Sequence, residues 1–256
     1  MKIFDFHLHP RYDFDRDTLP YERTDERFVS DLKKDGICRC AGSVIHIDDA
    51  YKDVAAYEEI VPRLNAEAYE FFRLYPDFFV PGIHVHREHA ELSYNQVLYY
   101  ADKGVKLVGE LVPYMMGGTC YSDPRLIEIL RAAADKGMVL SMHPNLKHPD
   151  DMEGLFRALP HMPIVVAHLD GYGLYDWSID MMKKYDNLYF DISAHGIDRE
   201  GMLKDAVQRV GASRILYGSD YPGYDSAPFI NAVCEAGLTD KEQEAIFFEN
   251  AASLLL

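Results

Sequence analysis

Eight short apolar runs divide this chain of 256 residues, and a longer, more charged segment follows each of them. The runs are rich in valine, isoleucine, leucine and phenylalanine and show little strict alternation, which is typical of strands buried on both faces of a parallel sheet. We therefore expect strands at Lys2–His7, Ala41–Ile47, Phe78–His84, Val105–Leu111, Met138–His143, Ile164–His168, Leu188–Ile192 and Ile215–Gly218.

The segments between the runs carry helix start and stop signals. Capping residues mark three helix starts: Thr24, Asp123 followed by Pro124, and Thr239 with Glu242 three residues later. Glycine or proline marks three helix ends, at Gly36, Pro76 and Gly137. These signals predict helices over residues 24–36, 58–75, 123–137 and 239–254.

Strands alternating with helices over about 250 residues are typical of a closed (β/α)8 TIM barrel, an α/β fold. No linker or internal repeat interrupts residues 1–256, so we expect a single domain. A doubly wound open sheet is the main alternative. The barrel is favoured because metal-binding residue types follow strands 1, 4, 5, 6 and 8, and only a closed barrel brings the ends of the first and last strands to one mouth.

His7-Leu8-His9 lies at the end of the first apolar run. On a strand, residues i and i+2 point to the same side, about 6.5–7 Å apart at Cα, so two imidazoles can converge on one metal ion. A lone His-x-His pair is weak evidence, but further ligand types follow later runs. The expected metal ligands are His7, His9, Glu110, His143, His168 and Asp220.

Composition narrows the class of partner. The formal net charge of −16 argues against nucleic acid and anionic membrane surfaces. No run of 18 or more apolar residues and no basic leader with an apolar stretch is present, so neither a membrane span nor a signal peptide is expected. The four cysteines form no C-x-x-C pair, which favours reduced thiols in a cytoplasmic protein.

The motifs at the strand ends resemble those of the amidohydrolase superfamily. More narrowly, they are similar to small TIM-barrel metal-dependent hydrolases related to amidohydrolase 2, a branch that also contains metal-dependent decarboxylases. The similar segments are FDFHLHP for the first strand, MHP at His143, AHLDG at His168, LYGSDYP at Asp220 and ENAASLL for the last helix. The resemblance covers essentially the whole chain.

The resemblance leaves the number of metal ions open. Several branches hold a second metal with a bridging carboxylate at strand 4, where Glu110 lies, whereas the decarboxylase-like branch uses one metal without such a bridge. A single Zn²⁺ would be held by both histidines of strand 1, by His143 and by Asp220. With two ions, His143 and His168 would hold the second and Glu110 would bridge. We expect one or two Zn²⁺ ions, with another divalent metal as the alternative.

Asp220 and His168 are the expected catalytic groups. Zinc lowers the pKa of bound water to about 7, and Asp220 is placed to accept the proton of that water and return it to the leaving group. With one ion, His168 would contact the attacking water or the substrate oxygen. Asp220 could instead be a turn residue and His168 a core histidine. The position that both residues share at strand ends favours the catalytic interpretation.

Loops at the barrel mouth are expected to set substrate specificity. Arg11 is suited to bind a carboxylate through two N–H groups, while a surface ion pair with nearby aspartates is an equal alternative. Tyr114, His195 and Tyr221 are the other expected substrate contacts. His84-Val85-His86 repeats the alternating pattern after the third run, and we interpret it as structural or substrate-lining.

Three functions agree with these residues. The leading interpretation is a metal-dependent hydrolase of a small-molecule amide, ester or lactone. The second is a non-oxidative zinc-dependent decarboxylase of a small carboxylate, favoured if Glu110 does not touch metal and Arg11 faces the pocket. The third is a non-catalytic barrel that binds metal or a ligand. The partner is a small-molecule substrate in each enzymatic case, and a homodimer remains open.

Overall fold

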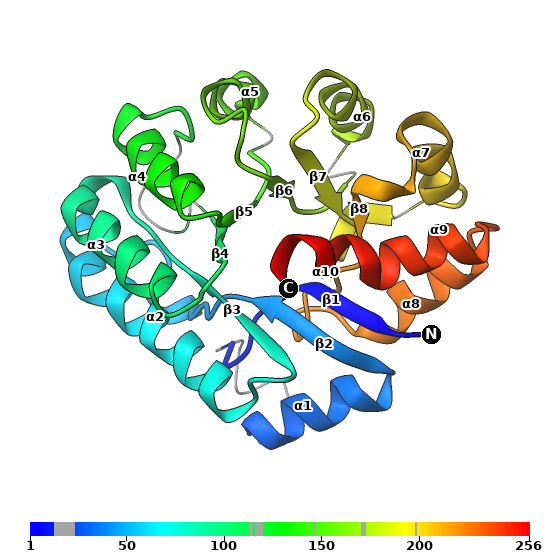
Figure 1. The fold of residues 1–256 in the computed structure, drawn as a ribbon, viewed down its shortest axis with the longest axis horizontal. Helices are drawn as coiled ribbons and strands as arrows, with labels where there is room; N and C mark the ends of the chain where they lie inside the picture. Colours follow the sequence, from blue (N-terminus) through cyan, green and yellow to red (C-terminus); the bar gives the residue numbers. More distant parts are fainter. Residues whose placement is uncertain (13–23, 113–114, 116–119, 146, 170–172, 198) are drawn as a thin grey trace.

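Eight parallel strands follow one another in chain order around a barrel (Figure 1). The computed structural model describes residues 1–12, 24–112, 115, 120–145, 147–169, 173–197 and 199–256. The strands are β1 (Ile3–Leu8), β2 (Ile37–Gly42), β3 (Phe79–Ile83), β4 (Leu107–Leu111), β5 (Val139–Met142), β6 (Ile164–Val166), β7 (Leu188–Asp191) and β8 (Ile215–Leu216). The predicted (β/α)8 barrel is confirmed.

Helices surround the strands, most of them in an outer ring (Figure 1). They are α1 (Asp25–Lys34), α2 (Tyr57–Leu74), α3 (Ala90–Ala101), α4 (Pro124–Asp135), α5 (Pro149–Ala158), α6 (Tyr175–Lys184), α7 (Met202–Val210), α8 (Ser226–Glu235), α9 (Asp240–Glu244) and α10 (Asn250–Leu255). The three predicted caps are confirmed, because Thr24, Asp123 and Thr239 each accept a hydrogen bond from a backbone N–H of the first turn. The predicted last helix is interrupted by a π-helical turn between α9 and α10.

The second predicted strand differs most from the observed bounds, and the other seven differ by one or two residues at an end. The second strand spans Ile37–Gly42 rather than Ala41–Ile47. Residues after Gly42 leave the strand ladder because their carbonyls bind side chains at the mouth: Ser43 O accepts from His9 Nδ1 at 2.9 Å and Val44 O accepts from His84 Nε2 at 2.8 Å. The eighth strand is shorter than predicted, since Gly218 lies in the connection to the mouth.

The barrel closes between the two ends of the sheet through backbone hydrogen bonds. Phe6 N–H donates to Tyr217 O at 2.9 Å, and His9 N–H donates to Tyr221 O at 2.8 Å. Asp220 N–H donates to His7 O at 2.8 Å. Closure therefore brings Asp220 beside the histidines of the first strand, as the barrel prediction required.

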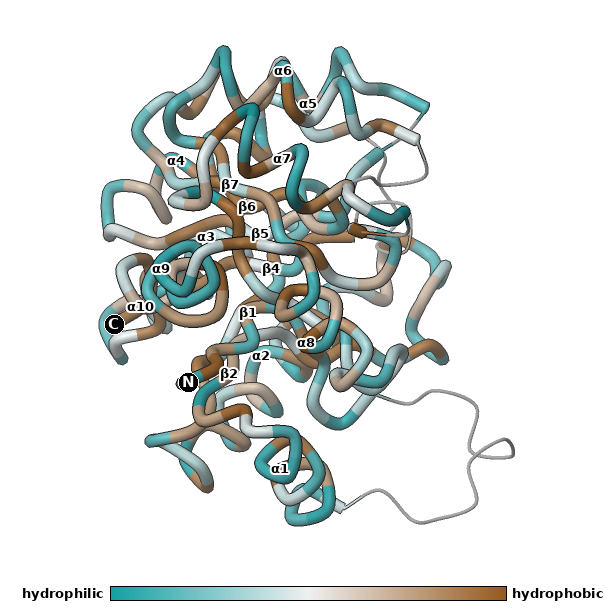
Figure 2. The backbone as a smooth tube through the Cα atoms, turned by 90° about the vertical axis from the view of Figure 1, so that its right-hand side faces the viewer, coloured by the Kyte–Doolittle hydropathy of each residue, from teal (hydrophilic) through white to brown (hydrophobic). Residues whose placement is uncertain are grey.

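One apolar cluster fills the barrel interior. It takes buried residues from seven of the eight strands, for example Phe4, Val80 and Leu216, together with Ala251 and Leu255 of α10. Helix α10 lies across the barrel beside β1 (Figure 1) and covers this cluster. Figure 2 shows the most hydrophobic segments in the central strands and hydrophilic ones on the outer helices. The interior is thus a packed core, so a functional site is expected at the mouth of the barrel.

The direction of side chains changes along β1. Phe4 and Phe6 belong to the interior cluster, whereas Leu8 belongs to the cluster between strands and helices. The pairing of β1 with β2 is irregular between Asp5 and Leu8. Such an irregularity shifts which residues face inward, so His7 and His9 follow the phenylalanines toward the barrel axis.

Two smaller expectations concern thiols and membranes. The four cysteines are free thiols. Among the described residues, no helix combines the length and the apolar character that a membrane crossing requires.

Helix α2 offers a matched test of packing. Phe71 is fully buried, with its ring centroid 5.6 Å from that of Phe28 and 4.9 Å from that of Phe79, whereas Leu74 on the same helix is exposed. We expect Phe71→Ala to lower the free energy of unfolding by about 3–5 kcal/mol and Leu74→Ala to change it by about 0.5 kcal/mol or less. Urea denaturation measures both, and equal effects would contradict this packing.

Candidate metal centre and active site

The carboxylate of Glu110 lies among four histidines at the barrel mouth. It projects from β4 and is buried. Its Oε2 lies 3.4 Å from His7 Nε2 and 3.5 Å from His9 Nε2. Its Oε1 lies 3.0 Å from His143 Nδ1 and 3.9 Å from His168 Nε2. Each carboxylate oxygen therefore faces a different pair of imidazoles.

Asp220 closes the cluster on the side of the first strand. Its Oδ1 lies 3.4 Å from His9 Nε2 and 3.8 Å from His7 Nε2. It is more exposed than Glu110, with side-chain exposures of 21% and 5%, respectively. Asp220 is therefore the carboxylate of the cluster that solvent or a substrate reaches most readily.

A buried aspartate at the end of β7 fixes the orientation of His7. Asp191 Oδ2 accepts a hydrogen bond from His7 Nδ1 at 2.8 Å. Its Oδ1 accepts from the backbone N–H groups of His168 at 3.2 Å and Ser193 at 3.0 Å, and also from Ser193 Oγ. This leaves Nε2 of His7 directed at Glu110. A carboxylate partner on the distal nitrogen is a common feature of histidines that ligate metals.

Backbone carbonyls orient the other two buried imidazoles in the same way. His9 Nδ1 donates to Ser43 O at 2.9 Å, and His168 Nδ1 donates to Ser193 O at 3.1 Å. In each ring Nδ1 is thus engaged, which leaves the Nε2 atom to face the centre of the cluster. Ser43 also binds the strand that carries the central carboxylate, because its Oγ accepts from Glu110 N–H at 3.0 Å.

Close packing explains one glycine at the end of β8. A Cβ atom at Gly218 would lie 2.9 Å from His7 Cβ and 3.3 Å from Ser193 Cβ. Any larger residue would push against the Cβ atoms of both His7 and Ser193. Glycine at this position therefore allows β7, β8 and β1 to bring their side chains together.

Opposite charges dominate the electrostatics of the cluster. Burial raises the pKa of Glu110, but the neighbouring His7 and His143 lower it more, so the net pKa lies well below its ordinary value. Burial lowers the pKa of His9, but its hydrogen bonds with Asp220 and Glu110 raise it to about 9. The site therefore stabilises positive charge among buried carboxylates, which is the environment that a divalent cation requires.

The donor set fits a divalent metal. Two sets of three side chains each place their nitrogen and oxygen atoms within 4.8 Å of one another. The first set is His7, His9 and Asp220, and the second is His7, Glu110 and His168. Within the part of the chain that the structure describes, His7 Nε2 is buried without a hydrogen-bond partner. Imidazole nitrogens and carboxylate oxygens are ligands that zinc and similar divalent ions accept. His143 belongs to neither set, but its Nδ1 contacts Glu110 Oε1 of the second set.

The remaining sequence candidates occupy different positions. Arg11 donates to Asp25 at 2.7 Å and to Glu70 at 2.7 Å. Its guanidinium therefore binds two carboxylates of the protein itself rather than facing a substrate. His195 Nε2 lies 3.1 Å from Tyr224 Oη in the connection after β7. Tyr221 packs its ring 5.2 Å from that of Phe28. Tyr114 lies outside the described residues.

Several residues around the cluster carried no clear signal in the sequence. Ser43, Ser193 and Ser219 are buried, and Ser219 Oγ donates to Asp5 Oδ2 at 2.6 Å. Asp5 Oδ1 also accepts from His7 N–H at 3.1 Å, so it holds the backbone of the first histidine. Buried serines and aspartates directly beside predicted ligands are the pattern that could have indicated these supports.

A match to a family model defines the class of this barrel. The model described as Amidohydrolase matches residues 5–256, nearly the entire chain. The chain therefore belongs to the amidohydrolase family, as its motifs predicted. No curated protein sequence matches it significantly.

Solved structures share the fold across their whole length. A 2,6-dihydroxybenzoate decarboxylase from Rhizobium has a TM-score of 0.75 and 16% identity, over 99% of this chain and 98% of its own. A 5-carboxyvanillate decarboxylase from Sphingomonas paucimobilis has a TM-score of 0.72 and 14% identity, over 99% and 98%. A dihydroxybenzoic acid decarboxylase from Polaromonas sp. JS666, with bound manganese and the inhibitor 2-nitroresorcinol, has a TM-score of 0.71 and 16% identity, over 99% and 96%. At these identities the likeness shows the fold.

The Asp191–His7 contact generates a prediction about metal affinity. We expect Asp191→Asn to weaken the binding of Zn²⁺ or Mn²⁺ about 10- to 100-fold, because the amide no longer fixes the tautomer and orientation of His7. Competition with a chelator measures the affinity, and circular dichroism checks the fold. Asp186→Asn, at an exposed aspartate before β7, is the control. Ser193→Ala, which removes one donor to Asp191, should give a smaller effect. Unchanged affinity in a folded Asp191→Asn protein would contradict the assigned role.

Proposed function

We propose that the protein is a metal-dependent hydrolase of a small-molecule amide, ester or lactone, with two divalent cations joined by Glu110. His7, His9 and Asp220 would hold one cation, His143 and His168 would hold the other, and Glu110 would contact both. Zinc or manganese suits this mixture of nitrogen and oxygen donors. When bound, a pair of such ions activates water and polarises the substrate carbonyl oxygen.

The two-sided environment of Glu110 is the observation that carries this proposal. Its Oε2 lies within 3.5 Å of both imidazoles of the first strand, and its Oε1 lies 3.0 Å from His143. A carboxylate that served only one ion would need imidazole neighbours at one oxygen. The arrangement at both oxygens supports a bridging role.

Asp220 is the proposed general base and acid. It is the partly exposed carboxylate of the cluster, and its backbone is fixed by the hydrogen bond from its N–H to His7 O. It would accept a proton from the attacking water and return it to the leaving amine or alkoxide. Hydrolysis then adds the oxygen of water to the acyl carbon and releases the protonated leaving group. His168 would act as a ligand through the Nε2 atom that its contact with Ser193 leaves available.

Decarboxylation of a small carboxylate is the second candidate, because two similar barrels, from Rhizobium and Sphingomonas paucimobilis, are decarboxylases. Two features of this chain favour hydrolysis over it. Arg11, the residue suited to bind a substrate carboxylate, donates to Asp25 and Glu70 instead. Glu110 faces imidazoles at both carboxylate oxygens, whereas the decarboxylase interpretation requires that it does not contact metal.

Isotope incorporation distinguishes the two reactions. Metal-loaded protein is incubated in H₂¹⁸O with a panel of amides, esters and lactones, and separately with aromatic carboxylates. We expect ¹⁸O in an acid product and no release of CO₂. Asp220→Asn, assayed at saturating metal, should reduce turnover about 10²- to 10⁴-fold, while Asp48→Asn, at an exposed aspartate after β2, should not.

Two results would overturn the proposal. Release of CO₂ without ¹⁸O incorporation would identify the protein as a decarboxylase. Wild-type turnover in Asp220→Asn would remove Asp220 from proton transfer.

A further inference from the structure

A fully buried tyrosine contacts the strand ends that carry Glu110 and His143. Tyr121 lies in the turn before α4, and its ring is fully buried. Its hydroxyl donates to His143 O at 2.5 Å and lies 3.1 Å from Leu111 O, the carbonyl of the residue after Glu110. The phenol therefore bridges the ends of β4 and β5, on the side of the site where His143 Nδ1 lies 3.0 Å from Glu110 Oε1.

The strand ladder is weak in this part of the barrel. The pairing of β4 with β5 is irregular between Val108 and Leu111, the interval that contains the central carboxylate. One backbone hydrogen bond follows, from His143 N–H to Leu111 O at 2.9 Å. Because β5 ends before His143, the carbonyl of this residue lies beyond the strand and accepts from the Tyr121 hydroxyl. The hydroxyl therefore fixes the backbone at the point where the ladder ends.

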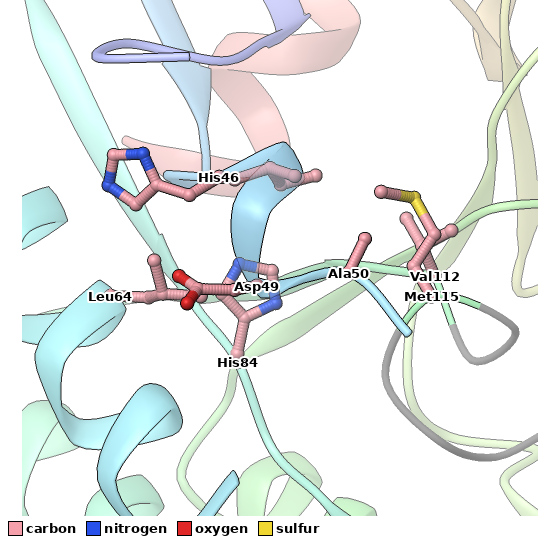
Figure 3. A pocket seen from close by; sticks show the side chains of 8 residues that line it. His46, Asp49, Ala50, Leu64, His84, Val112 and Met115 are labelled. Carbon is pink, nitrogen blue, oxygen red and sulfur yellow. The ribbon is translucent and has the colours of Figure 1, made fainter. Parts of the chain in front are cut away.

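The first part of the connection after β4 packs in another direction. Val112 and Met115 line a small apolar pocket beside Ala50 of the connection between β2 and α2 (Figure 3). Met115 O accepts from Tyr57 Oη of α2 at 2.6 Å. The start of the connection is thus held toward α2, whereas Tyr121, at its other end, contacts the end of β5.

Asp151, in the first turn of α5, holds the turn that carries Tyr121. Its Oδ2 accepts from Tyr121 N–H at 2.5 Å, and its Oδ1 accepts from Ser122 N–H at 2.9 Å and from Ser122 Oγ at 2.5 Å. Cys120 Sγ donates to the same Oδ1 at 3.2 Å. Burial raises the pKa of Asp151, but the hydrogen bonds from Ser122 and Tyr121 lower it more, so the carboxylate is charged near neutral pH.

A glycine allows this helix to approach the turn closely. A Cβ atom at Gly154 of α5 would lie 3.0 Å from Ser122 Cβ and 3.5 Å from Ser122 Oγ. A larger residue would push the helix away from the turn. Glycine at this position therefore lets Asp151, one helical turn earlier, reach the backbone of residues 121 and 122 with both carboxylate oxygens.

We propose that Tyr121 is a positioning residue that fixes His143 against Glu110, and that Asp151 acts through it. The inference rests on the proposed function in one respect, since it takes His143 as a ligand of the second ion. Without the hydroxyl, the backbone of His143 loses its contact beyond β5, and metal binding on this side of the site weakens. The histidines of the first strand keep their own supports, Asp191 and Ser43.

The test uses two variants and a matched control. Tyr121→Phe removes the hydroxyl and keeps the buried ring, and Asp151→Asn removes the charge that holds the turn. Tyr217→Phe is the control, because Tyr217 is also fully buried and its hydroxyl donates to a backbone carbonyl, Ser226 O, at 3.1 Å. Circular dichroism and the melting temperature check the fold of each protein.

The binding of Zn²⁺ is measured by competition with a chelator. We expect Tyr121→Phe to weaken the binding of one of two ions about 10-fold and to leave the other unchanged, because the change reaches the metal through one ligand. Asp151→Asn should act on the same ion by a smaller factor. Tyr217→Phe should leave both affinities unchanged.

NMR of the metal-free protein reports the position of the His143 ring without any ion or substrate. We expect the ¹⁵N resonance of His143 Nδ1, which contacts Glu110, to shift in Tyr121→Phe. The ring of His84, a buried histidine whose Nε2 donates to Val44 O, is the reference and should keep its resonances. A merely structural role of the hydroxyl would lower the melting temperature without moving the His143 resonance.

The outcomes separate this inference from the proposed function. A shifted His143 resonance in a protein that binds one ion or hydrolyses no substrate would support the positioning role and contradict the proposed function. Two bound ions, with the affinities and the His143 resonance unchanged in Tyr121→Phe, would contradict the positioning role alone. Equal weakening of both ions, or the same loss in Tyr217→Phe, would also overturn it. Unchanged affinity in Asp151→Asn would remove Asp151 from the assignment.

Discussion

The burial of the Glu110 carboxylate is the constraint on which the rest of the site depends. A charge at this depth is unfavourable unless cations or hydrogen-bond donors surround it. Four histidines, from the ends of β1, β5 and β6, direct nitrogen atoms toward its two oxygens. Either protons on these imidazoles or metal ions between them can compensate the charge, so proton binding and metal binding compete at this site.

The barrel supports this arrangement through a few buried polar residues. Asp191 of β7 orients His7 and at the same time accepts from the backbone of His168, which ties three strand ends together. Ser43 holds His9 with its carbonyl and the backbone of Glu110 with its hydroxyl. Because the same residues hold predicted ligands from different strands, we expect a change in one of them to affect several of these side chains together.

The sequence places the predicted metal ligands better than it indicates the residues that support them. His7, His9, Glu110, His143 and Asp220 could be placed at one mouth because parallel strands in a closed barrel all end on the same side. The contacts of Asp191 with His7, 184 residues away, depend on side-chain packing across the barrel and have no local pattern. The same limit applies to Arg11, whose partners Asp25 and Glu70 lie on two helices. The end of β2 was misplaced because the apolar run after Gly42 continues into the mouth, where its carbonyls serve side chains.

The number of metal ions per chain tests the bridging role of Glu110 most directly. The wild type and Glu110→Gln are both purified without a tag or chelator. Each is reloaded with excess Zn²⁺ or Mn²⁺, unbound metal is removed, and the metal content is measured by elemental analysis. A bridging carboxylate predicts about two ions per chain in the wild type and at most one in Glu110→Gln. One ion per chain in both proteins would contradict the bridge, and no metal in either would contradict the metal centre itself.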